Sequence, residues 1–349
     1  MKEHTYPLKM DHIAAGVCYY PEHWGETYWK KDLQLMKELG LETARVGEFA
    51  WNFFEPREGV YDFALFDRFL DEAKEAGVKI IFCTPTCTPP AWLSRRYPET
   101  LNTTIEGNPY RHGMRQHHNM TSPVYLEKCD RLIEAMASHF GSHPAIIGWC
   151  PFNETWGYRE EREKNALLSS IYKLTKRLDP TRPCIDSSGN YRVISEVYDI
   201  HDYDQNTESF LARYNGLSQR MEETGGVIPA EDPFFNSVPE APNGRPPFFN
   251  QPYEGQPVFI SEYGGIRWPD ETVAGWGYGN APTTPEEYFA RYRGLTEALL
   301  NNPDICGFCY TQLYDVEQEV NGLYTYGRKE KFDIQIIREI NQQKAAIEE

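Results

Sequence analysis

Two short apolar runs, far apart in the chain, each end in a glutamate. The first covers residues 146–152 and is followed by Asn153 and Glu154, and the second covers residues 257–261 and ends in Glu262. Near-continuous apolar runs of this length are typical of strands buried in a parallel sheet. Each glutamate alone could be a solvated strand end. Two together favour glycoside hydrolysis, in which one carboxyl protonates the leaving oxygen and the other attacks the anomeric carbon.

Eight segments with strand character alternate with helical or irregular crossovers along the 349 residues. The expected strands are Ile13–Tyr19, Glu42–Val46, Val78–Cys83, Ile146–Phe152, Pro183–Asp186, Glu196–His201, the run that ends in Glu262, and Ile305–Thr311. Parallel strands joined by crossovers form α/β folds, and eight of them close most simply into a barrel. The pattern predicts a single (β/α)8 barrel, a TIM barrel, and one domain over residues 1–349.

Polar side chains gather where the expected strands end. They are Arg45, Asn153, Glu154, His201 and Glu262. Active sites of these barrels are built at the carboxyl ends of the strands. We therefore expect these five residues to share one site.

The net charge limits the partners of the chain. Lys and Arg number 35 against 52 Asp and Glu, which gives −17 at neutral pH. Nucleic acids and anionic membranes need positive charge on the protein, so we expect neither as a partner. The aromatic content of 14% suits a neutral glycoside or oligosaccharide, whose rings have apolar faces. The first residues lack the apolar core of a signal peptide, which favours a cytoplasmic location.

Two clusters could bind a metal ion. Cys306 and Cys309 have the two-residue gap of a metal knuckle, but no second knuckle accompanies them. Arg111, His117 and neighbouring polar residues crowd an irregular stretch, which could equally contact substrate or be an exposed loop. We expect no metal ion and no cofactor.

The first part of the chain, to about residue 147, resembles the catalytic barrel of family 42 glycoside hydrolases, the β-galactosidases. The segments that carry the resemblance are Gly16–Trp24, Ala44–Trp51, Thr88–Leu93 and Arg115–His118. From about residue 148 the chain is similar to the barrel of family 2 glycoside hydrolases. Here the segments are Pro151–Gly157, Leu178–Pro183, His201–Tyr203, Phe259–Gly265 and Tyr310–Tyr324.

The double resemblance implies a chimera of two half-barrels, 1–147 and 148–349, joined near the fourth strand and engineered. A natural, divergent single-domain enzyme is the alternative. Both families belong to one clan of TIM barrels. In that clan the acid/base is on strand four and the nucleophile on strand seven.

The resemblance also implies roles for single residues. Glu154 would be the general acid/base and Glu262 the nucleophile of a retaining β-glycosidase. Asn153 would bind the sugar 2-hydroxyl, and Arg45 would keep the nucleophile ionised, unless it forms a purely structural ion pair. Arg115 would contact substrate.

Two further residues, His201 and Tyr263, match positions that contact sugar or the nucleophile in these families. Trp156 and Tyr310 would line the subsites. Buried structural roles are the alternative for each of them. β-Galactoside is the expected substrate, with β-glucuronide and β-mannoside as alternatives. Other readings are a catalytically silent scaffold or sugar-binding module, and a metal-dependent hydrolase that uses residues 111–119.

Overall fold

A computed structural model describes residues 12–155, 161–189, 191–230, 232, 251–269 and 275–348. The chain divides into two compact units, which are described separately. Unit 1 comprises Met1–Tyr19, Lys31–Arg45 and Val197–Glu349, and unit 2 comprises Tyr20–Lys30 and Val46–Glu196. The single domain expected over 1–349 stays a prediction.

Unit 1 is built on a parallel sheet. Its strands are β1 (Ala14–Cys18), β2 (Thr43–Val46), β5 (Tyr198–Asp202), β6 (Val258–Tyr263) and β7 (Ile305–Tyr310), in the order β2-β1-β7-β6-β5. All residues of β2, β5, β6 and β7 are buried. Burial on both faces fits the apolar sequences of β7 and of most of β6. β2 and β5 are equally buried but carry charged or polar side chains, Arg45 on β2 and Asp199, His201 and Asp202 on β5.

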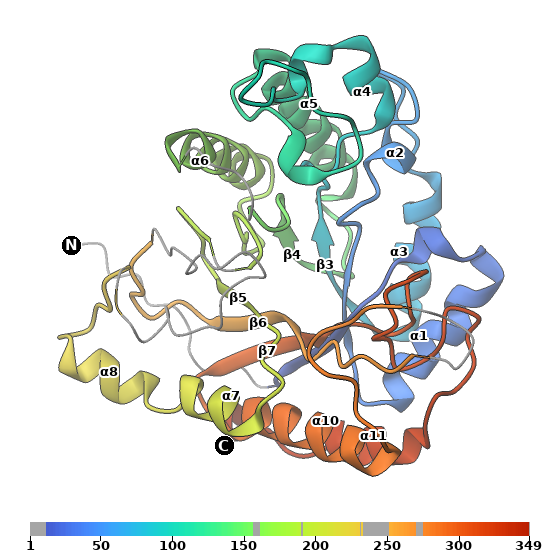
Figure 1. The fold of residues 1–349 in the computed structure, drawn as a ribbon, viewed down its shortest axis with the longest axis vertical. Coiled ribbons are helices and arrows are strands. Elements are labelled where there is room, and N and C mark those ends of the chain that lie inside the picture. The colour runs from blue at the N-terminus through green and yellow to red at the C-terminus, as the bar shows by residue number, and fades with distance from the viewer. Residues whose placement is uncertain are drawn as a thin grey trace. The chain divides into compact units, whose positions relative to one another are not determined.

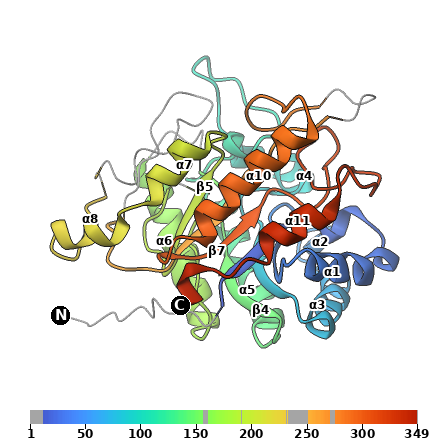
Figure 2. The same ribbon diagram turned by 90° about the horizontal axis from the view of Figure 1, so that it is seen from below.

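The helices of this unit are α1 (Trp29–Glu38), α7 (Thr207–Tyr214), α8 (Leu217–Glu223), α10 (Pro285–Leu300) and α11 (Ile334–Asn341). In Figure 1, α7, α10 and α11 run along one side of β5, β6 and β7, and Figure 2 shows α10 between the other two. Helix α10 begins where Thr284 caps it and Pro285 occupies its first turn. Its buried face includes Tyr288, Tyr292 and Leu295.

Unit 2 contains β3 (Lys79–Cys83) and β4 (Ile146–Cys150), which pair in parallel. Its helices are α2 (Trp51–Phe54), α3 (Ala64–Ala76), α4 (Ala91–Arg96), α5 (Pro123–Phe140) and α6 (Glu161–Leu178). Short 3-10 turns cover Pro21–His23, Glu26–Tyr28, Pro98–Thr100, Arg115–His117 and, in unit 1, Ala346–Glu348. Within the described ranges, none of the helices combines the length and the apolar character needed to cross a bilayer.

The segment expected as a fifth strand, Pro183–Asp186, does not form a continuous ladder. Within it, Cys184 makes an isolated parallel bridge to Trp149 of β4, and just beyond both segments Ser188 makes another to Asn153. The chain turns here because the Asp186 carboxylate accepts hydrogen bonds from the backbone of residues 187, 193 and 194. The segment therefore occupies the place of a strand without the regular hydrogen bonding of one.

A buried carboxylate on α1 ties the chain after β7 to the start of unit 1. Asp32 has no exposed surface, and it accepts hydrogen bonds from Tyr19 (2.6 Å) and Tyr314 (2.7 Å). It also forms an ion pair with Arg328, whose guanidinium lies 4.5 Å from the centre of the Tyr314 ring. A buried charge is tolerated only when it is paired and hydrogen-bonded, so these partners depend on one another.

We predict that Asp32→Ala lowers the free energy of unfolding by about 3 kcal/mol or more, because it removes the buried carboxylate that pairs with Arg328 and accepts hydrogen bonds from Tyr19 and Tyr314. Urea unfolding measures the change. Glu127→Ala is the control, since it removes only an exposed ion pair with Arg131 on α5 and should cost about 0.5 kcal/mol or less. Equal losses in the two variants would contradict the role given to Asp32.

Candidate active site

Glu262 lies near the end of β6 beside His201 of β5. The two residues are register partners in the parallel ladder. Partners in a parallel ladder point their side chains to the same face, and His201 Nδ1 is 3.2 Å from Glu262 Oε2. Two of the five residues expected to share a site are therefore neighbours in unit 1.

Arg45 reaches Glu262 from the other end of the sheet. Its Nη1 donates to Glu262 Oε1 at 2.5 Å, and Arg45 has no exposed surface. β2 and β6 are separated by β1 and β7, so in a flat sheet the two strands would be about 14 Å apart. The contact requires the sheet of unit 1 to curl, with both side chains on its concave face. The Arg45 guanidinium thus lies directly against the Glu262 carboxylate as an ion pair.

Tyr203 is a further residue of this cluster that the sequence analysis did not select. Its hydroxyl is 2.5 Å from Glu262 Oε2 and 3.2 Å from Thr311 Oγ1. A signal was available, since Tyr203 follows His201 by two positions and alternate residues of an extended chain share a face. With Arg45 and His201, Tyr203 surrounds both carboxylate oxygens of Glu262 with potential donors.

Glu154 lies in unit 2, just after β4, in an unusual backbone conformation. Its φ is +53°, a left-handed value that costs a non-glycine residue on the order of 1 kcal/mol. The bridge beside β4 holds it there, because Glu154 N donates to Ser188 O and Ser188 N donates to Phe152 O. Strain of this kind gathers at functional sites.

Arg115 and Asn153 accompany Glu154. Arg115 Nη2 donates to Glu154 Oε2 at 2.7 Å, and its Nη1 donates to the Asn153 carbonyl at 3.0 Å. The guanidinium also lies 5.6 Å from the centre of the Phe49 ring. Asn153 is buried, and its Oδ1 accepts a 2.6 Å hydrogen bond from Ser188, which orients the amide. Three residues expected at the site are thus together in unit 2.

Tyr263 and Tyr310, expected to contact sugar, are fully buried in unit 1. The Tyr263 hydroxyl is 2.9 Å from Thr296 on α10, and the Tyr310 hydroxyl is 3.0 Å from Tyr288. Tyr263 follows Glu262 directly, so in a strand it points to the opposite face, toward the helices. We correct the expectation for both residues to the core role that had been left open.

Trp156, expected to line a subsite, lies outside the described residues.

The residues of the 111–119 cluster have different surroundings. Arg115 contacts Glu154, whereas His118 is buried against Tyr125 with ring centroids 5.9 Å apart. Burial lowers the pKa of His118 to about 4, so the ring is neutral at pH 7. All eight cysteines, including Cys306 and Cys309 on β7, are buried thiols.

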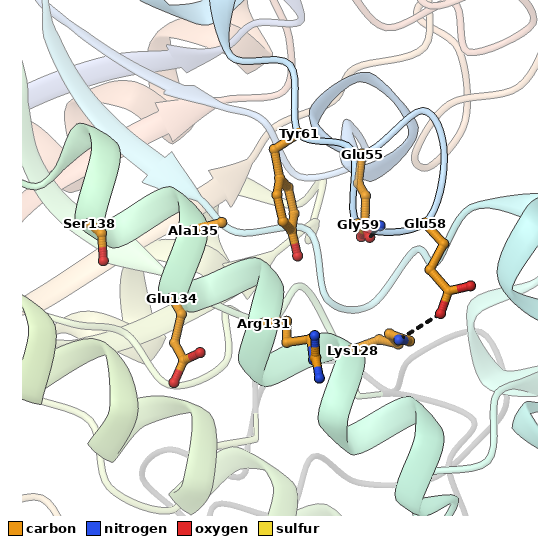
Figure 3. A pocket seen from close by; sticks show the side chains of 9 residues that line it. All are labelled: Glu55, Glu58, Gly59, Tyr61, Lys128, Arg131, Glu134, Ala135 and Ser138. Carbon is orange, nitrogen blue, oxygen red and sulfur yellow. Dashed lines mark hydrogen bonds and ion pairs between the residues drawn. The ribbon is translucent and has the colours of Figure 1, made fainter.

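A surface pocket of about 510 Å³ lies in unit 2 between α5 and the chain before α3 (Figure 3). None of the expected site residues lines it. Two of its carboxylates are engaged by protein donors, since Glu58 pairs with Lys128 at 2.8 Å and Glu55 accepts from Trp51 and the Gly59 backbone. We therefore assign this pocket no part in the chemistry.

Glu22 is a second unusual carboxyl in unit 2. Its Oε2 is enclosed and has no hydrogen-bond partner in the described part of the chain. Burial, with a smaller contribution from the charge of Glu48, raises the pKa of Glu22 from 4.5 to about 8. In the folded protein this carboxyl therefore holds its proton at neutral pH.

The pKa of Glu22 is higher in the folded state, so between about pH 4.5 and about pH 8 Glu22 is ionised in the unfolded chain but protonated in the folded protein. The free energy of unfolding therefore falls as pH rises through this interval. We predict that this fall, on the order of a few kcal/mol, is absent in Glu22→Gln. Urea unfolding at pH 5 and pH 8.5 measures it, with the exposed Glu99→Gln as control. An unchanged pH dependence in Glu22→Gln would contradict the assignment.

The chain resembles glycoside hydrolases in both sequence and fold. Residues 18–168 match the β-galactosidase model of glycoside hydrolase family 42. This range contains Arg45, Arg115, Asn153 and Glu154 but not Glu262, and it continues past the join expected near residue 147. β-Galactosidase BgaA of a Thermus species is 43% identical over 139 residues, which are 40% of this chain and 22% of that protein.

Solved structures extend the fold comparison to nearly the whole chain. A β-galactosidase from the psychrophilic Marinomonas ef1 matches 95% of this chain and 59% of its own, with 20% identity and a TM-score of 0.67. A family 2 β-galacturonidase from Eisenbergiella tayi matches 96% of this chain and 51% of its own, with 17% identity and a TM-score of 0.60. The chain spans less than two thirds of each of these proteins. It has the α/β fold of the TIM-barrel glycosidases, and residues 18–168 are similar in sequence to family 42 β-galactosidases.

Proposed function

We propose that the chain is a retaining β-glycosidase of the β-galactosidase type, with Glu262 as nucleophile and Glu154 as general acid/base. The observation that carries the proposal is the surroundings of Glu262. Its carboxylate faces Arg45, His201 and Tyr203 at 2.5 to 3.2 Å, an arrangement that holds the side chain in a fixed position. A nucleophile must be positioned before the reaction, and these contacts support that role.

In the first step a Glu262 oxygen attacks the anomeric carbon, the bond from that carbon to the leaving oxygen breaks, and Glu154 transfers its proton to the leaving oxygen. In the second step water attacks the same carbon, the ester bond to Glu262 breaks, and the Glu154 carboxylate accepts a proton from the water. The anomeric configuration is retained because two displacements occur.

Arg115 has opposite effects on the two roles of Glu154. Its 2.7 Å contact favours the carboxylate, the form that the second step needs as a base. The first step needs the protonated acid, so we propose that bound substrate draws Arg115 away from Glu154. The expected contact of Arg115 with substrate fits this requirement. Asn153, oriented by Ser188, would bind the sugar 2-hydroxyl.

The proposed preference for β-galactosides is supported by the similarity of residues 18–168 to β-galactosidases. It is easily tested. Aryl β-galactoside, glucoside, mannoside and glucuronide compared at one concentration give the preference directly. A folded protein that binds sugars and turns none of them over would be the silent scaffold or binding module. Loss of activity with a chelator would favour the metal-dependent reading.

We predict that Glu262→Gln lowers kcat/KM on the preferred glycoside at least about 10³-fold with any leaving group, because no other carboxylate can form the ester. Glu154→Gln should lower it about 10²-fold to 10⁴-fold on an alkyl glycoside, whose leaving oxygen needs a proton. On a dinitrophenyl glycoside the effect of Glu154→Gln on the first step should be small, because that phenolate leaves unprotonated.

Glu134→Gln is the matched control, since it removes a carboxylate from the pocket of Figure 3 and should leave the rates unchanged. Equal sensitivity of Glu154→Gln to good and poor leaving groups would contradict its role as acid. Undiminished turnover by Glu262→Gln would contradict the whole mechanism.

Two further expectations stay predictions. The chain as a join of family 42-like and family 2-like halves is one, and a cytoplasmic location is the other. Since the family 42 match continues to residue 168, a join at residue 147 would have to fall inside it.

A further inference from the structure

Tyr278 lies face to face with Tyr203 in unit 1. The ring centroids are 3.4 Å apart and the ring planes differ by 2°. The Tyr203 hydroxyl, at the end of the stacked ring, is 2.5 Å from Glu262 Oε2. One ring therefore separates Tyr278 from the proposed nucleophile.

The backbone, and not attraction between the rings, fixes this stack. Aromatic pairs prefer offset or edge-to-face arrangements over a direct sandwich. Tyr278 N donates to Gly265 O at 3.0 Å, and Tyr278 bridges Ile266 in parallel. Two positions earlier, Trp276 N donates to Gln318 O and Trp276 O accepts from Val320 N, both at 2.8 Å. The segment 275–279 is thus fastened on two sides.

Gly265 makes room for both rings. It has a φ of +53°, and a Cβ there would lie 2.5 Å from Tyr278 Cδ2 and 3.1 Å from Tyr203 Cε1. Gly265 follows Glu262 by three residues, so the turn that ends β6 also seats the stack. Gln205 links the backbone of Tyr203 to this turn, because its side-chain amide donates to the carbonyls of Tyr203 (3.1 Å) and Gly264 (2.6 Å).

We propose that Tyr278 is a positioning residue that holds the Tyr203 ring so that its hydroxyl stays on Glu262. The inference rests on the proposed function only where activity is the measurement. A tyrosine side chain turns about two bonds, and Tyr203 is only partly buried. With Tyr278 covering one face of the ring, rotation is blocked and the hydroxyl is kept between Glu262 and Thr311.

The first test observes Tyr203 without requiring turnover. 3-Fluorotyrosine placed at position 203 alone gives one ¹⁹F signal, and Glu262→Gln identifies the shift that loss of the carboxylate contact produces. Tyr278→Ala should shift or broaden the signal, whereas Tyr278→Phe, which keeps the stacked ring, should leave it near the wild-type position. Tyr61→Ala removes a comparable, partly buried ring that stacks on Phe63 in unit 2, and serves as the control.

The second test measures coupling in the reaction. Tyr278→Ala and Tyr203→Phe should each lower kcat/KM about 10-fold to 100-fold, as expected for loss of a hydrogen bond to a charged group. Because Tyr278 acts through Tyr203, adding Tyr278→Ala to Tyr203→Phe should lower the value by less than about 2-fold. Tyr278→Phe should retain most of the activity.

The outcomes separate the two proposals. A ¹⁹F signal that is the same in Tyr278→Ala as in wild type, or losses that multiply in the double variant, would overturn the positioning role. Turnover that survives Glu262→Gln would overturn the proposed function, while the ¹⁹F comparison would still decide the role of Tyr278.

Discussion

The buried contact between Arg45 and Glu262 is the constraint on which the arrangement of unit 1 depends. Two charges removed from water cost more than their attraction returns unless further hydrogen bonds are made, so a buried ion pair by itself is weak evidence for stability. Here the glutamate also faces His201 and Tyr203. The contact can form only because the sheet curls between β2 and β6. The site around Glu262 therefore requires the curvature of the sheet.

The two proposed catalytic carboxyls are prepared in different ways. Glu262 lies among an arginine with no exposed surface, a histidine and a phenol, whose contacts hold its carboxylate in one position. Glu154 is held on a strained turn and contacts Arg115, which is itself partly exposed (20% of its side chain). Arg115 is therefore less enclosed than Arg45, which has no exposed surface. This difference fits the proposed roles of a nucleophile held in place and an acid/base whose arginine partner is drawn away by substrate.

The sequence predicted much of the fold and part of the site, for reasons that can be stated residue by residue. Apolar runs in the sequence predicted β4 and β6. Glu154 and Glu262 were then found because each lies where such a run ends. Pro183–Asp186 was expected as a regular strand, and its bridges are isolated because the Asp186 side chain takes up nearby backbone donors. Hydrogen bonding of backbone groups by a side chain leaves no periodic pattern in the sequence from which it could be predicted.

Within the site, the errors have a common cause. Tyr263 was expected to contact sugar or the nucleophile because it matches such a position in the families, but it follows Glu262 directly, neighbours in a strand face opposite sides, and it packs under α10. Tyr203 and Tyr278 were passed over because their roles depend on a contact between segments 75 residues apart, with Gly265 as the space they share. Arg45 was found at a strand end, whereas its role beside the nucleophile and the role of Arg115 came from family resemblance, because their distant partners leave no local pattern.

The most direct test of the central claim is to trap the covalent intermediate. A 2-deoxy-2-fluoro-β-galactoside with a dinitrophenyl leaving group slows both displacements while keeping the first possible, so the glycosyl-enzyme should accumulate. Mass spectrometry of the digested protein then locates the added sugar. We predict the adduct on the peptide that contains Glu262, and on that residue within it. An adduct on any other carboxyl, or hydrolysis of β-galactosides without an adduct, would contradict the assignment of Glu262 as nucleophile.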